Sequence, residues 1–164
     1  MTATVIGLGN DARRDDGAGL TAARALAARL GDGARVIVGV RETTELLEFF
    51  GSDGPTIVVD AVRSGRPPGT VVRWDTSEGR PFRDAAPVST HGLSLPEALE
   101  LAETLEGAIP RIVVYGIEAG ELGPGDGLTD AVRRGVDEAV ERIATELAPV
   151  EPVARRTGRR SAHA

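Results

Sequence analysis

The chain of 164 residues contains no cysteine and no lysine, and it has two histidines, His91 and His163. The lack of cysteine excludes disulfides, thiolate metal sites and a cysteine nucleophile. The lack of lysine excludes Schiff-base chemistry and the lysine of a phosphate-binding P-loop. Because His163 is the penultimate residue, histidine chemistry in a folded domain depends on His91. A metal site would therefore need carboxylates among its ligands.

Long hydrophobic runs and an excess of positive charge are also absent. No apolar run approaches the roughly 18 residues of a membrane span, so we expect no membrane partner. The net charge of −6 argues against nucleic acid as the main partner. The N-terminus lacks a basic stretch, and its first apolar run is typical of a strand, so we expect no signal peptide. We therefore expect a cytoplasmic protein that acts as a monomer.

Short strand-like runs alternate with helical segments along the chain. The β-branched run at 56–59 is typical of a strand buried on both faces. Only about eight residues separate its end from the run at 69–74, too few for a parallel crossover, so we place that strand antiparallel. Ser94 and Thr129 are expected to cap helices. The expected strands are 3–8, 34–40, 56–59 (ending in Asp60), 69–74 and 111–115, and the expected helices are 17–30, 44–50, 94–105 and 130–147.

This order of elements predicts a three-layer α/β/α sandwich around a five-stranded, mostly parallel (mixed) sheet. We expect one domain over residues 1–147, followed at 148–164 by a basic, proline-broken tail that is disordered. Ligands of such sheets bind at the carboxyl ends of the strands. Polar residues that follow strand ends are therefore the candidates for a site.

Three residues fall on segments that this fold brings to one edge of the sheet: Asp16 after the first strand, Asp60 at the end of the third, and His91 just before the third helix. Each has a simple structural explanation, since Asp16 could cap a helix, Asp60 could stabilise a turn, and His91 could be an ordinary surface or core residue. Together they offer two oxygens and one nitrogen to a divalent cation such as Ni²⁺, Zn²⁺ or Mn²⁺. Three protein ligands leave coordination positions open, as in catalytic sites, where a metal can polarise a carbonyl or activate water.

Separated motifs carry a resemblance to the hydrogenase maturation endopeptidases. They are GLGN at 7–10 followed by DDG at 15–17, IVVDAV at 57–62, STHGL at 89–93, YGIE at 115–118 and GLT at 127–129. The resemblance covers about residues 3–147, with the elements in the right order. It implies an endopeptidase that removes a short C-terminal peptide from the large subunit of a nickel-containing hydrogenase once nickel has been inserted.

The resemblance also implies roles for individual residues. The family's metal-ligand and catalytic positions fall on Asp16, Asp60 and His91, which would recognise the nickel of the substrate. Nickel would thus arrive with the precursor of a [NiFe]-hydrogenase large subunit, and no resident organic cofactor is implied. Asp15 is expected to be a charge at the helix N-terminus or a group that supports the ligands. The stretch GVRETT at 39–44 departs from the glycine-rich segment that many relatives use in substrate selection.

Two other functions remain open at this stage. A dinucleotide-binding module is suggested by the Gly-x-Gly-x-x-Ala pattern at 7–12 and by Glu42 after the second strand. Asp15 and Asp16 argue against it, because they occupy the helix start where a pyrophosphate would bind. A hydrogenase-assembly protein that binds the precursor without cutting it would need the same Asp/Asp/His triad, so the sequence does not separate it from the endopeptidase.

Overall fold

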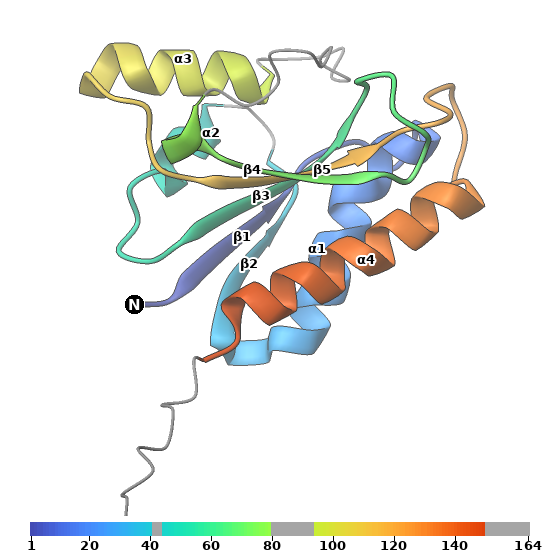
Figure 1. Ribbon diagram of the computed structural model, residues 1–164, viewed down its shortest axis with the longest axis horizontal. Helices are drawn as coiled ribbons and strands as arrows, with labels where there is room; N and C mark the ends of the chain where they lie inside the picture. The colour runs from blue at the N-terminus through green and yellow to red at the C-terminus, as the bar shows by residue number, and fades with distance from the viewer. Residues whose placement is uncertain (41–43, 80–93, 150–164) are drawn as a thin grey trace, which may run out of the picture.

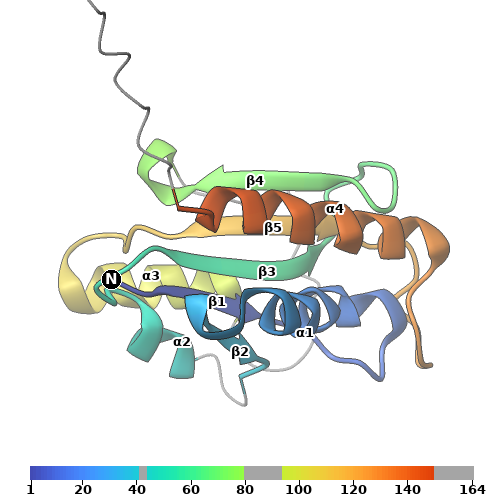
Figure 2. The ribbon, with the colours of Figure 1, turned by 90° about the horizontal axis from the view of Figure 1, so that it is seen from below.

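A computed structural model describes residues 1–40, 44–79 and 94–149, and it shows a sheet with helices on both faces (Figures 1 and 2). The strands are β1 (Ala3–Gly7), β2 (Ala34–Val38), β3 (Thr56–Val62), β4 (Val71–Asp75) and β5 (Val113–Glu118). The helices are α1 (Ala18–Leu30), α2 (Glu45–Phe49), α3 (Leu95–Glu106) and α4 (Asp130–Leu147), with short 3-10 turns η1 (Arg14–Gly17), η2 (Gly31–Gly33) and η3 (Thr76–Glu78).

The sheet has the strand order β2-β1-β3-β5-β4. Strands β2, β1, β3 and β5 pair in parallel, whereas β4 pairs antiparallel with β5. The connection between β3 and β4 is too short for a crossover, which leaves β4 to return in the opposite direction at the edge. The predicted mixed, mostly parallel α/β sandwich is therefore confirmed.

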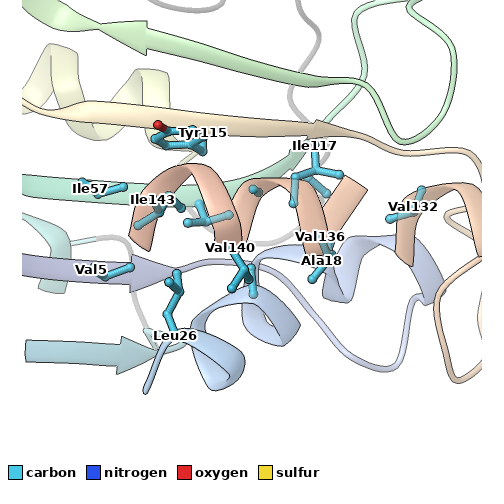
Figure 3. Close-up of a cluster of buried hydrophobic side chains, with 14 of the residues drawn as sticks. Val5, Ala18, Leu26, Ile57, Tyr115, Ile117, Val132, Val136, Val140 and Ile143 are labelled. Carbon is cyan, nitrogen blue, oxygen red and sulfur yellow. The ribbon is translucent and has the colours of Figure 1, made fainter. Parts of the chain in front are cut away.

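Two hydrophobic clusters hold the layers together. The larger one joins the sheet to α1 and α4, and its side chains include Leu26 from α1, Ile117 from β5 and Ile143 from α4 (Figure 3). The second lies on the opposite face, where Val58 of β3 packs with residues of α2 and α3 such as Leu99. Because side chains alternate along a strand, neighbouring residues of β3 belong to different clusters.

Two strands extend at their carboxyl ends by two or more residues beyond the sequence prediction. We expected β3 to stop at Asp60, but it continues to Val62, because Ala61 and Val62 pair with the last two residues of β5. Strand β5 likewise extends to Glu118 instead of ending at Tyr115. Asp60 thus lies within a strand and not in a turn.

The helix starts confirm one predicted cap and correct another. Ser94 forms a capping box with Glu97, whose carboxylate accepts a hydrogen bond from the Ser94 N–H at 2.6 Å. Thr129 occupies the N-cap position of α4, but its side chain does not cap the helix. Its hydroxyl donates to the carboxylate of Asp15 instead.

The predicted tail begins where α4 ends at Leu147. Residues 150–164 lie outside the described residues, so the domain boundary and the disorder of the tail stay predictions. In the parts of the chain that the structure describes, every helix is too short or too polar to cross a membrane.

Candidate functional site

The loops that follow β1, β3 and β5 meet at one end of the sheet, which we call the carboxyl edge (Figure 1). Strand β1 ends at Gly7, which pairs with Val59 of β3. Asp60 is the next residue of β3, so it lies just beyond the end of β1 while its other neighbour, Gly116 of β5, still pairs with it. Asp60 is placed at the carboxyl edge although its strand continues.

Close packing of α1 against the sheet brings Asp16 to the same place. A Cβ on Gly19 would lie 2.4 Å from the carbonyl oxygen of Val59, so only glycine allows the first turn of α1 to approach the strands this closely. The 3-10 turn η1, which contains Asp16, packs against β3. The sequence prediction that Asp16 and Asp60 share one edge of the sheet agrees with this geometry.

Both carboxyl groups have raised pKa values, which makes each of them harder to ionise. Asp16 is 5% exposed, and burial raises its pKa, partly offset by the guanidinium of Arg13 at 3.5 Å. The pKa of Asp60 is raised to about 8, first by burial of its carboxyl group, then by the charge of Asp16, against a hydrogen bond from the backbone of Ala61. A divalent cation beside both oxygens would offset this repulsion and favour the ionised forms.

Asp15 does not cap α1, and it faces away from solvent with 0% exposure. Its carboxylate accepts hydrogen bonds from the backbone N–H groups of Gly120 at 2.9 Å, Glu121 at 2.7 Å and Thr129 at 2.8 Å. The loop between β5 and α4 is therefore tied to the residue that precedes Asp16. The expectation that Asp15 supports the site from nearby agrees with this position.

The sequence motif YGIE contains a residue whose structural role we had not assigned. Glu118, 2% exposed, accepts from the backbone N–H and the hydroxyl of Ser64 at 2.8 and 2.7 Å, and from the N–H of Gly65 at 3.0 Å. A carboxylate that directly ends a buried strand is a signal for such a role, because a buried charge needs several donors.

His91 and the atypical stretch 41–43 lie outside the described residues, so the position of the histidine and the effect of the departure stay predictions. Within the described ranges, no three His, Cys, Asp or Glu side chains form a group that could hold a metal. Asp16 and Asp60 are the two predicted ligands that lie within the described residues, and hard oxygen atoms such as theirs suit a divalent cation.

The turn after β1 is shaped for Asp16 and not for a pyrophosphate. Gly9 has φ of +133°, and a Cβ there would lie 1.9 Å from the carbonyl oxygen of Asp16. The N–H of Asn10 also donates to that oxygen at 3.1 Å. The glycine thus lets the turn fold back on its own backbone, which argues against the dinucleotide-binding alternative.

Comparisons with known proteins agree with this geometry. The family model of hydrogenase maturation proteases matches residues 26–146. The hydrogenase expression/formation protein HupD of Thiocapsa roseopersicina is 29% identical over 155 residues, which cover 93% of this chain and 70% of that protein. The [NiFe] hydrogenase maturation protease HybD of Thermococcus kodakarensis has a TM-score of 0.71 and 32% identity over 91% of this chain and all of that one. The hydrogenase maturating endopeptidase HybD of E. coli has a TM-score of 0.70 and 25% identity, over 90% of this chain and 92% of its own. By the family model and these likenesses, the chain belongs to the hydrogenase maturation protease family and is an enzyme that hydrolyses peptide bonds.

Proposed function

We propose that this protein removes a C-terminal peptide from the nickel-loaded precursor of a [NiFe]-hydrogenase large subunit. Asp16, Asp60 and His91 recognise the nickel, which the precursor brings as part of the substrate. The observation that carries the proposal is the pair of acids at the carboxyl edge, where burial and the neighbouring charge raise the pKa of Asp60 to about 8. Such a perturbed pair in an enzyme is a candidate for its functional site.

The chemistry of the pair fits transient contact with a metal that belongs to the partner. Two carboxylates without thiolates are hard ligands, so they bind a borderline divalent ion less firmly than cysteine does. Asp60 lies on the same face of the sheet as Val58, because side chains alternate along the strand, and α3 covers this face. His91 precedes Ser94, the cap of α3, by three residues in the sequence. The histidine is proposed to complete the set from this side.

Contact with the nickel would position the precursor so that the scissile peptide lies at the carboxyl edge. Recognition of an inserted metal would also restrict cleavage to precursors that already carry it, because the carboxylates gain a favourable partner only then. In this proposal, the chain's own residues recognise the substrate and place it for hydrolysis.

The test is intact-mass analysis of a nickel-loaded large-subunit precursor incubated with the protein. Loss of a discrete C-terminal peptide, absent without nickel, is the expected result. Asp16→Asn, Asp60→Asn and His91→Ala should each abolish it. Asp11→Asn is the matched control, since Asp11 lies in the same connection between β1 and α1, is exposed and pairs with Arg24 at 2.5 Å. An unchanged mass despite stable complex formation would instead favour a non-cleaving assembly role, and a normal rate with His91→Ala would refute the triad.

A further inference from the structure

Two buried carboxylates at the carboxyl edge are not among the proposed nickel ligands. Asp15 and Glu118 are 0% and 2% exposed, and each accepts hydrogen bonds from a different loop. Building on the proposed function, we propose that Asp15 and Glu118 are positioning residues, which lock these loops so that Asp16 and Asp60 keep the spacing that the nickel-bearing precursor requires.

Asp15 fastens the loop at residues 119–129 at both of its ends. Its Oδ2 accepts from the N–H groups of Gly120 and Glu121, and its Oδ1 accepts from the N–H of Thr129. The N–H of Asp15 also donates to the carbonyl oxygen of Glu121 at 3.0 Å. Since Asp16 is the next residue, any opening of this loop would shift the backbone that carries the first ligand.

Glu118 fastens the loop that follows β3. Its carboxylate holds Ser64 and Gly65, while its own backbone pairs with Val62 in the sheet. Asp60 is two residues before Val62, and its neighbour across the sheet is Gly116, two residues before Glu118. The hydrogen bonds of the Glu118 carboxylate therefore secure the last two residue pairs between β3 and β5 beyond Asp60. They fix the strand that carries the second proposed ligand.

The two carboxylates differ in how their hydrogen bonds would respond to replacement by a neutral amide side chain. Both oxygens of Asp15 accept from backbone N–H groups, so the amide nitrogen of an asparagine would face a donor in either orientation. At Glu118, Oε1 accepts from the N–H groups of Ser64 at 2.8 Å and Gly65 at 3.0 Å, while Oε2 accepts from the Ser64 hydroxyl at 2.7 Å and shares the Ser64 N–H at a longer 3.1 Å. A glutamine can donate to that hydroxyl oxygen and keep Oε1 as the acceptor for both N–H groups, so it gives up only the longer of the two contacts with the Ser64 N–H. Asp15→Asn should thus be harmful and Glu118→Gln tolerated.

The experiment measures kcat and KM for processing of the nickel-loaded precursor, together with amide hydrogen exchange of the full-length protein. Asp15→Asn and Glu118→Ala should raise KM about tenfold or more, the loss typical of removing a partner that orients metal ligands. Exchange should accelerate at Gly120, Glu121 and Thr129 in the first variant and at Ser64 and Gly65 in the second. Glu118→Gln should stay within about threefold of wild type in KM, because it keeps the acceptor for both N–H groups.

Glu146→Gln is the matched control. Glu146 also accepts hydrogen bonds, from Arg73 at 2.6 Å and from the hydroxyl of Tyr115 at 2.6 Å. It lies on the last turn of α4, which covers the opposite face of the sheet from Asp60. This variant should lower thermal stability and leave KM unchanged.

The outcomes separate the two proposals. If the wild-type protein leaves the precursor intact, the proposed function fails and the positioning role fails with it. If wild type cleaves but Asp15→Asn and Glu118→Ala match Glu146→Gln in KM, the proposed function survives and the positioning role is refuted. Faster exchange with an unchanged KM, or a raised KM with unchanged exchange, would also refute it, because the ligands would then not depend on the loops.

Discussion

Removing the charge of Asp60 should stabilise the metal-free protein at alkaline pH. The pKa of this carboxyl is raised in the folded state from 3.8 to about 8, so between these values the folded protein holds a proton that the unfolded chain has released. Stability therefore falls as pH rises through this interval, and the penalty is complete above the folded pKa. Asp60→Asn resembles the protonated acid in shape and carries no such penalty.

The size of the effect follows from the shift. The interval from 3.8 to about 8 corresponds to at most about 6 kcal/mol, at 1.36 kcal/mol per pH unit. Part of Asp60 is exposed, so water screens its charge, and we expect a gain of about 2–3 kcal/mol in the free energy of unfolding. The gain should be small near pH 4 and should grow until about pH 8, where the wild-type carboxyl ionises.

Urea unfolding followed by circular dichroism, with chelator present, measures the effect at several pH values. Asp32→Asn serves as the control, since it removes an exposed carboxylate from the turn after α1. Its stability should differ little from that of wild type, because the side chain is exposed. If Asp60→Asn and wild type had equal free energies of unfolding at pH 8.5, or if the variant were less stable, ionisation of Asp60 would not be what destabilises the folded protein at this pH. The stabilised variant should at the same time lose processing activity, as expected where stability and function conflict.

Three further predictions concern the scaffold and are checked by urea unfolding at neutral pH. Gly7→Ala would place a Cβ 2.4 Å from a backbone oxygen of α1, so we expect the free energy of unfolding to fall by at least about 2 kcal/mol. A fall below about 0.5 kcal/mol would mean that α1 can move away from β1 at little cost. Ile143→Ala empties a fully buried position (Figure 3) and should cost about 3 kcal/mol, whereas Leu105→Ala, 67% exposed, should cost less than about 0.5 kcal/mol. Equal costs for this pair would contradict the packing described. Tyr115→Phe removes a hydroxyl that donates to a carboxylate of α4 at 2.6 Å, and we expect a loss of about 1–2 kcal/mol. No change would show that this hydrogen bond merely replaces one to water.

Strand and helix content could be predicted because the local patterns are strong. The β-branched run of β3 and the capping box at Ser94 each depend on neighbouring residues alone, so both are confirmed. The antiparallel course of β4 followed from chain length, since a short connection cannot cross over the sheet. The ends of β3 and β5 were placed too early, because a strand stops where its partner stops, and the partner is distant in sequence.

Asp16 and Asp60 could be named as candidates from the sequence because each follows an apolar run. The parallel pairing of the strands then brings both residues to one edge of the sheet. The hydrogen-bond partners of Asp15 and Glu118, in contrast, became known only from the folded structure. Their donors lie at residues 120–129 and at 64–65, and no local pattern reveals which loop a buried carboxylate will meet. The predicted cap at Thr129 was wrong for the same reason: its hydroxyl donates to Asp15 and makes no capping hydrogen bond to α4.

Local sequence patterns were thus enough to predict the helices and strands, their order along the chain and the acids near the strand ends. The reason is that apolar periodicity and turn chemistry depend on residues that are close in sequence. Charge and burial act over contacts that only the folded chain creates. The tertiary structure alone therefore decided that Asp60 lies beside Asp16 in surroundings that raise its pKa to about 8, and that two further carboxylates are buried where loops close around them.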